Sequence, residues 1–146
     1  MLGRAALIEA LRGTPGVISL VAERSGSLLG HALFSPVSGQ GPNGAAQAGI
    51  ALGPVAVRPE QQRLGVGTAL ILEGLGRCRA AGWTAAFVLG DPAYYSRFGW
   101  QPAAQWELRC QWEVPPTAFQ AMDLVPESLS GWQGLVRYHP EFDDLG

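Results

Sequence analysis

Two glycines near the middle of the chain, Gly65 and Gly67, stand where a polar turn passes into a stretch of helical periodicity. The turn, residues 58–62, follows the apolar residues 55–57. The first amide groups of a helix have no intrahelical acceptor, and the positive end of the helix dipole lies beside them. Glycines at this point leave the backbone open to a ligand. The spacing therefore predicts an anion site, and a pyrophosphate group is the ligand that suits it best.

Two other phosphate-binding motifs with glycine loops are excluded by the neighbouring residues. The Walker loop requires a lysine that reaches the terminal phosphates, and the chain contains no lysine. The dinucleotide-binding fingerprint requires a third glycine three residues after Gly67, but Leu70 occupies that position. Nucleotide hydrolysis or dinucleotide binding through these motifs is therefore not expected.

The segment from Gln62 to Gly67 resembles the pyrophosphate loop of the GCN5-related N-acetyltransferases, the GNAT superfamily. In that family the loop begins with Arg or Gln and places its two small residues at the fourth and sixth positions. Its successive amides hold the pyrophosphate of coenzyme A. The resemblance implies that acetyl-CoA is the cosubstrate and that Gln62 shapes the start of the loop. The amides it assigns to the pyrophosphate belong to Arg63, Leu64, Gly65, Val66, Gly67 and Thr68.

A second signature of the same family follows in the expected order. The sequence Tyr94-Tyr-Ser-Arg-Phe-Gly-Trp100 resembles the family's motif of an aromatic pair followed by glycine and a second aromatic residue, after its fifth strand and in its fourth helix. The sequences of residues 52–57 and 88–92 are closer still to those of the predicted acetyltransferases of the YhbS-like branch. That likeness runs from about Leu11 to near the end of the chain. It implies an α/β (α+β) fold of the acyl-CoA N-acyltransferase type, with a mixed, centrally splayed sheet flanked by helices.

The family resemblance also implies a reaction, the direct transfer of an acetyl group from acetyl-CoA to a primary amine. A backbone N–H in the central strand, around Val55 to Val57, would face the thioester oxygen, and Tyr95 would protonate the departing thiolate as general acid. The residues alone leave a competing interpretation for Tyr95, a core aromatic that packs its helix on the sheet. Tyr94 is the competing assignment for the acid, but alignment on Gly99 favours Tyr95.

No general base is assigned. Many relatives place a glutamate just before the central bulge, whereas residues 51–54 of this chain are Ala, Leu, Gly and Pro. Three other candidates exist, Glu23, His31 and Asp91, but Asp91 is predicted to cap the helix that follows it and His31 is expected to be a half-buried strand residue. The amine can also arrive neutral or lose its proton to water.

The family normally begins with a strand and a long helix ahead of the segment that opens this chain, so those elements are expected to be absent or truncated here. This expectation keeps a second class open, a non-catalytic acyl-CoA-binding or regulatory module. The uncharged residues 37–47 and three tryptophans could line an acceptor pocket, although packing explains the tryptophans equally well. These tryptophans are Trp106, Trp112 and Trp132.

Composition limits the remaining possibilities. The 146 residues suit a single domain, residues 1–146, which needs no metal, and His31 and His139 lie far apart without companion cysteines. Charged residues make up only 15% of the chain, which is compatible with a homodimer. The net charge of −2 argues against a nucleic-acid partner and mildly favours a cationic acceptor. No apolar run reaches the ~20 residues of a membrane span, and no signal segment is present, so a cytoplasmic protein is expected.

The elements that must position these residues follow from periodicity and breakers. We predict helices over residues 1–11, 66–81 and 92–98, and strands over residues 17–23, 28–34, 48–57, 84–89, 105–114, 118–124 and 134–138. Residues 37–47 are expected to form a surface loop, residues 48–57 a strand buried on both faces, and the tail after residue 139 a loose segment. The helix 66–81 should bury Ile71, Leu72, Leu75 and Cys78.

Two smaller expectations concern side chains. Glu73 and Arg77 should pair across one helical turn. Cys78 and Cys110 are interpreted as small buried hydrophobic residues.

Overall fold

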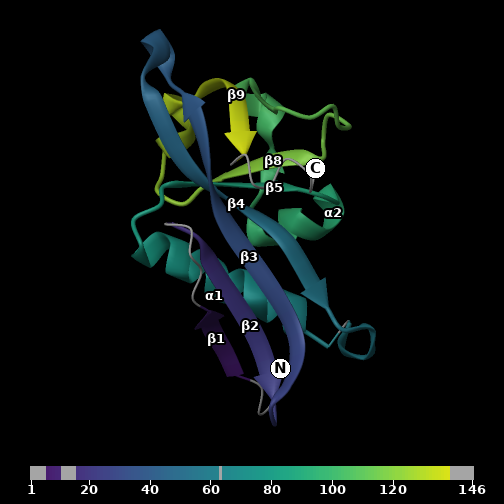
Figure 1. The fold of residues 1–146 in the computed structure, drawn as a ribbon. Coiled ribbons are helices and arrows are strands. Elements are labelled where there is room, and N and C mark those ends of the chain that lie inside the picture. Colours follow the sequence, from purple (N-terminus) through teal and green to yellow (C-terminus); the bar gives the residue numbers. More distant parts are fainter. Residues whose placement is uncertain (1–5, 11–15, 63, 139–146) are drawn as a thin grey trace. The chain divides into compact units, whose positions relative to one another are not determined.

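The computed structural model describes residues 6–10, 16–62 and 64–138. Its elements form two compact units (Figure 1). The first unit takes in residues up to 34 and residues 52–81, and the second takes in residues 35–51 and everything from residue 82. Two long strands, β3 (Ser27–Gln40) and β4 (Ala46–Val57), each contribute one part to either unit. Each unit is described separately below.

The first unit is an antiparallel sheet with one helix. Its strands are β1 (Ala6–Ala10), β2 (Ile18–Arg24), the first part of β3 and the last part of β4, in that order. The predicted hairpin between β2 and β3 is confirmed, with Ile18 opposite Phe34 and Arg24 opposite Ser27. Its tight turn places Ser25 and Gly26 at positive φ, as the twist of a two-residue hairpin requires.

The N-terminal prediction was wrong where it can be compared. Residues 6–10 form strand β1, which pairs antiparallel with β2 from Ala6 opposite Glu23 to Ala10 opposite Ser19. The apolar spacing of this stretch satisfies a helix, but backbone pairing with β2 overrides that local preference. Residues 1–5 and 11 of the predicted helix lie outside the described residues.

Helix α1 (Val66–Ala80) follows the glycine loop nearly as predicted. Ile71, Leu75 and Cys78 are buried, and Leu70 joins them, but Leu72 is 56% exposed, so its predicted place in the apolar stripe was wrong. A buried stripe recurs at three and four residues, and Leu72 falls a full residue beyond it. The predicted pair of Glu73 and Arg77 is confirmed, with 3.0 Å between carboxylate oxygen and guanidinium nitrogen.

The second unit contains the remaining strands. The first part of β4 is followed across its sheet by β5 (Ala85–Leu89), β8 (Phe119–Asp123) and the short β6 (Gln101–Pro102). β5 and β8 are antiparallel, whereas β9 (Gln133–Tyr138) pairs antiparallel with β3 and parallel with β7 (Leu108–Cys110). The strand pairing is therefore mixed, as the fold prediction requires.

The predicted loop over residues 37–47 was also wrong for most of its length. β3 continues through Pro36 to Gln40, a 3-10 turn spans Pro42–Gly44, and β4 begins at Ala46. The glycine that suggested a loop has another role. A Cβ at Gly39 would come within 2.5 Å of the Trp132 ring, so the absent side chain makes room for a neighbouring indole.

The long strand predicted over residues 105–114 is reduced to the three residues of β7. A 3-10 helix covers Ala103–Trp106, and Glu107 adopts a left-handed conformation with φ 60°. Residues 111–114 are irregular. Alternation of apolar and polar residues permits a strand, but only residues 108–110 find a partner strand, β9.

Burial along β4 departs from the prediction as well. Residues 49–52 are buried on both faces, but residues 53–57 alternate between half-buried and exposed. The continuous apolar sequence therefore predicted the centre of the strand correctly and its end wrongly. In the second unit, Phe87 stacks on Phe119 at 5.7 Å between ring centroids and contacts Trp132 at 5.0 Å. Trp132 thus belongs to the core rather than to a pocket.

Both cysteines are free and buried, as predicted. Burial raises the pKa of the Cys78 thiol to about 12, which keeps it protonated at neutral pH. Among the described residues, no helix combines the length and apolar character that crossing a lipid bilayer would require.

Candidate functional site

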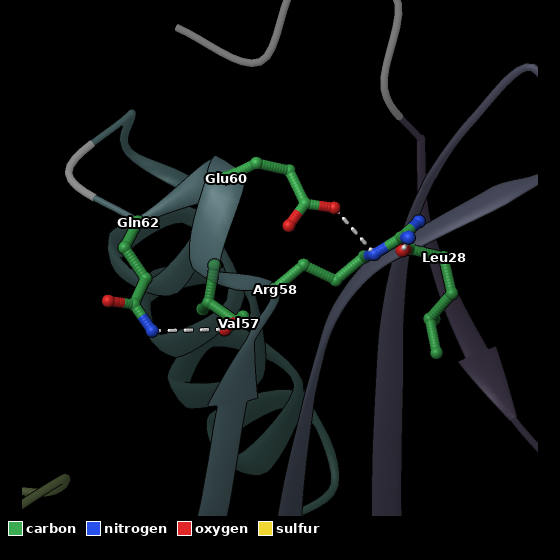
Figure 2. A network of polar contacts seen from close by, with 5 residues as sticks. All are labelled: Leu28, Val57, Arg58, Glu60 and Gln62. Atoms are coloured by element: carbon green, nitrogen blue, oxygen red, sulfur yellow. Dashed lines mark hydrogen bonds and ion pairs between the residues drawn. The ribbon is translucent and has the colours of Figure 1, made fainter.

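The turn between β4 and α1 is held by polar contacts to the backbone (Figure 2). Gln62 donates its side-chain amide to the carbonyl oxygen of Val57 at 3.3 Å, which closes the turn across five residues. Arg58 donates to the carbonyl oxygen of Leu28 at 3.3 Å and pairs with Glu60 at 2.9 Å. The backbone N–H of Arg58 also donates to Leu29 at 2.9 Å, so the turn is tied to β3. The side chains of Gln62 and Arg58 therefore hold the turn in shape, and the groups left for a ligand are those of the backbone.

The helix start that follows has the features of an anion site. Gly65 adopts a left-handed conformation, φ 90° and ψ 2°, directly before α1, and no side chain caps the helix. The first bond of the helical ladder runs from Ala69 N–H to the Gly65 carbonyl at 3.0 Å. The amides that precede it lie at the positive end of the helix dipole. Gly65 is exposed and Gly67 half-buried, so a phosphate group could reach this backbone.

The predicted cofactor residues can be located individually. Gln62, Leu64 and Gly65 are exposed in the turn, Val66 is buried as the first residue of α1, and Gly67 and Thr68 are half-buried in its first turn. These six residues lie in the first unit, three in the turn and three in the first turn of α1. The seventh, Arg63, lies outside the described residues.

The end of β4 holds the two valines predicted to provide an oxyanion donor. Val55 and Val57 are half-buried, with Ala56 between them exposed. Pro54 precedes them and has no amide hydrogen, so β4 cannot complete a hydrogen-bonded ladder at that residue.

In the second unit, helix α2 (Pro92–Tyr95) carries the tyrosine pair. The predicted cap is confirmed, because the Asp91 carboxylate accepts a hydrogen bond from Ala93 N–H at 2.9 Å and Pro92 occupies the first helical position. A 3-10 turn (Ser96–Phe98) continues the helix, and Gly99 ends it in a left-handed conformation with φ 110°. The local sequence therefore determines where this short helix begins and ends.

Tyr95 is fixed by aromatic packing. Its ring meets Trp100 edge to face at 5.6 Å and Tyr94 at 5.0 Å. Trp100 is itself almost completely buried and donates its indole N–H to the Ala86 carbonyl at 3.2 Å. Burial, with a smaller contribution from Tyr94, raises the pKa of the Tyr95 phenol above its ordinary value of 10.0. The Tyr95 phenol is therefore neutral at physiological pH, and its ring is held in place by its neighbours.

The two tyrosines differ in their surroundings. The guanidinium of Arg97 lies over the Tyr94 ring at 5.4 Å, and Phe98 packs against the same ring. Tyr95 instead lies against the backbone of Gly90, where an added Cβ would come within 2.5 Å of the Tyr95 ring. Gly90 is a site residue that the sequence analysis did not identify. Its signal was its position at the end of strand β5, directly before the cap of α2.

A buried glutamine contacts the backbone of Gly90 as well. Gln120 is completely buried on β8, its amide donates to the carbonyl oxygen of Gly90 at 3.4 Å, and its side-chain oxygen has no partner among the described residues. Two of the three candidate general bases form other hydrogen bonds. Asp91 caps α2, and His31 is half-buried in β3 with Ser19 at 3.1 Å. Glu23 is half-buried in β2.

The second unit also contains a pocket of about 240 Å³, lined by residues between Ala104 and Phe119 and called here the 104–119 pocket. Trp112 lines it, in agreement with one of the two roles considered for the tryptophans, and Trp106 and Trp112 both pack against the hydrophobic core. Arg109 and Glu113 also line the pocket; both are exposed, as the alternating pattern predicted, but nothing in that pattern indicated a pocket beside them.

Known proteins resemble this chain in both sequence and structure. Residues 13–103 match the family described as "Acetyltransferase (GNAT) domain". The uncharacterized N-acetyltransferase YhbS of Escherichia coli K12 is 39% identical over 127 residues, 86% of this chain and 74% of that protein.

Two solved structures are similar as well. The E. coli YhbS structure, determined in complex with CoA, has a TM-score of 0.79 at 38% sequence identity. The match covers 88% of this chain and 71% of the YhbS chain. A GNAT acetyltransferase of Brucella melitensis, in complex with acetyl-CoA, has a TM-score of 0.67 at 40% identity over 86% of this chain and 68% of its own. With the glycine loop and the capped tyrosine helix in place, these matches establish that the chain belongs to the GNAT acetyltransferase family.

Proposed function

We propose that the chain, with residues 1–146 acting as one catalytic domain, transfers the acetyl group of acetyl-CoA to a primary amine. The observation that carries this proposal is the uncapped start of α1 behind a left-handed Gly65. Membership of the family supports it, and so do the CoA and acetyl-CoA bound to YhbS and to the Brucella relative. In the proposed complex the amides of residues 63–68 bind the pyrophosphate, and Gln62 keeps the turn closed.

The proposed reaction requires no covalent enzyme intermediate. The neutral amine attacks the thioester carbonyl, the new C–N bond forms, and the carbonyl oxygen becomes an oxyanion. A backbone N–H at Val55 or Val57 stabilises that oxyanion, and one such donor typically contributes about 3 kcal/mol. The tetrahedral intermediate then expels the thiolate as the C–S bond breaks. Tyr95 gives its phenolic proton to the sulfur, the surplus proton of the nitrogen leaves to water, and the phenolate regains a proton from solvent.

The protonation state of Tyr95 suits this role. A general acid must carry its proton at the operating pH, and burial holds the pKa of Tyr95 above 10.0. A thiolate is already a good leaving group near neutral pH, so protonation contributes modestly. We therefore assign no general base and expect Tyr95 to affect turnover rather than binding.

Calorimetric titration with acetyl-CoA and with CoA, followed by a thiol-release assay on a panel of amines, tests the proposal. We expect micromolar binding of both ligands and amine-dependent thiol release. Tyr95→Phe should lower kcat about tenfold, less than the roughly hundredfold or more typical of a general acid because the thiolate is already a good leaving group, and leave the Kd for acetyl-CoA unchanged. Tyr94→Phe is the matched control and should retain wild-type turnover.

Each part of the proposal can fail separately. Wild-type turnover in Tyr95→Phe would refute the assignment of the acid. Binding of acetyl-CoA without turnover on any amine would instead support a non-catalytic acyl-CoA-binding or regulatory module. Absence of binding would refute the role of the glycine loop.

A further inference from the structure

The 104–119 pocket has a floor and walls that suit a small apolar group. Leu108, Cys110 and Phe119 are buried at its base, and Trp112 and Val114 are half-buried around them. Two exposed prolines, residues 115 and 116, extend the rim. A volume of about 240 Å³ is below the usual range for drug-sized ligands, so the pocket suits a small molecule.

The segment that forms the pocket is held in position. The Cys110 thiol donates to the Trp112 carbonyl at 3.3 Å, and the turn behind it is closed by Ala118 N–H on the Pro115 carbonyl at 2.9 Å. Gln111 accepts a hydrogen bond from Tyr138 N–H at 2.6 Å, and the rings of Trp112 and Tyr138 lie 4.8 Å apart. These contacts attach an irregular segment to strand β9. A ligand would therefore meet a preformed surface and pay little ordering entropy.

Two opposite charges complete the lining. Arg109 and Glu113 both line the pocket and are exposed, and neither forms an ion pair or hydrogen bond through its side chain with the part of the chain that the structure describes. Water can solvate both exposed charges, so each side chain is available to a ligand. An apolar floor beneath one cation and one anion matches a ligand with an apolar body and two opposite charges.

We propose that the 104–119 pocket binds a free α-amino acid with an apolar side chain. Arg109 binds the carboxylate, Glu113 binds the ammonium group, and the side chain lies against Phe119 and Trp112. This binding does not depend on the proposed function.

Titration calorimetry with the full chain, in the absence of acetyl-CoA, tests this assignment with three matched probes. L-leucine carries both charges, L-leucinamide lacks the carboxylate, and 4-methylpentanoate lacks the amine. We expect leucine to bind about three- to tenfold more tightly than either analogue, because each analogue lacks one partly exposed charge pair of about that strength. Equal affinity of leucinamide would overturn the proposal and point to the N-terminus of a peptide as the ligand.

Two variants assign the charges. Arg109→Gln should weaken leucine and 4-methylpentanoate about three- to tenfold and leave leucinamide unchanged, whereas Glu113→Gln should weaken leucine and leucinamide and leave 4-methylpentanoate unchanged. Glu107→Gln is the control, because Glu107 is exposed in the same segment but does not line the pocket. Failure of leucine to bind, or equal affinity in all variants, would overturn the proposal. Leucine binding without acetyl-CoA binding would refute the proposed function and leave the pocket assignment standing.

Discussion

The glycine loop before α1 and the tyrosine helix α2 provide function in opposite ways. In the loop, the groups offered to a ligand belong to the backbone, and the side chains of Gln62 and Arg58 only brace the turn. In α2, the proposed reactive group is the side chain of Tyr95, and both its orientation and its pKa depend on packing. A backbone site requires a particular conformation, whereas a side-chain site requires particular neighbours. The two regions should therefore respond to different kinds of substitution.

The largest effect is expected where a substitution changes the backbone of the loop. Gly65→Val places a β-branched residue in a left-handed conformation, which costs about 1–3 kcal/mol or forces the loop to rearrange. We expect the affinity for acetyl-CoA to fall about tenfold to a hundredfold, measured by calorimetry. Wild-type affinity in this variant would contradict the view that the loop acts through its conformation.

A control exists in the same helix. A Cβ added at Gly76 meets open space. Gly76→Ala should leave acetyl-CoA binding unchanged and stabilise the fold by about 0.5–1 kcal/mol, since alanine favours a helix interior. Thermal unfolding measures that gain.

The second effect tests the side-chain region through a neighbour. Gly90→Ala should displace the Tyr95 ring, because the added Cβ would come within 2.5 Å of it. We expect kcat to fall about tenfold while the Kd for acetyl-CoA stays constant, as for loss of one general acid. Gly131→Ala is the control, since its nearest neighbour would be a flexible side-chain atom at 3.6 Å. A parallel loss of binding and turnover in Gly90→Ala would mean that the two regions are not separable in this way.

The third prediction separates the regions by pH. Tyr95 must be protonated to act as an acid, so its contribution to kcat should persist up to about pH 10 and be lost as the pH rises through its raised pKa. The stability that its protonated, buried form contributes is lost in the same direction. Backbone amides do not titrate there, so the loop should not cause a matching loss of acetyl-CoA affinity. A rate profile of Tyr95→Phe that keeps the same alkaline limb would assign that limb to another group.

The smallest effect is expected for a side chain that braces the loop. Gln62→Leu removes one exposed hydrogen bond, to the Val57 carbonyl at 3.3 Å. Such a bond contributes about 1 kcal/mol or less, so the affinity for acetyl-CoA should fall less than about fivefold. A loss as large as that of Gly65→Val would show that Gln62 contacts the ligand directly.

Much of the site could be predicted because it is encoded locally. The ends of the two helices need particular residues: a residue that tolerates the left-handed conformation, or a side chain that caps the first amides. The sequence shows these residues directly, as Gly65 before α1, Asp91 and Pro92 at the start of α2, and Gly99 after the 3-10 turn that continues α2. The hairpin of β2 and β3 and the buried centre of β4 followed from patterns of the same short range.

The failures share one physical cause, dependence on residues far away in sequence. Residues 6–10 form a strand because β2 is there to pair with them, and β3 runs on to Gln40 because β9 continues its ladder. Residues 111–114 leave the predicted strand, since among the described residues β9 pairs with β7 only from residue 108 to residue 110. Local periodicity cannot report any of these pairings.

The sequence by itself therefore determined the family, the cofactor loop and the tyrosine helix, since helix starts and caps depend on residues within one or two turns. Only the tertiary structure decided which residues surround Tyr95 and which line the 104–119 pocket. Gly90 and Gln120 meet because segments distant in sequence pack together, whereas Arg109 and Glu113 line the pocket because the segment around them leaves the regular strand that its alternation predicted. Side-chain environments are long-range properties, and they became visible only once the strands were paired.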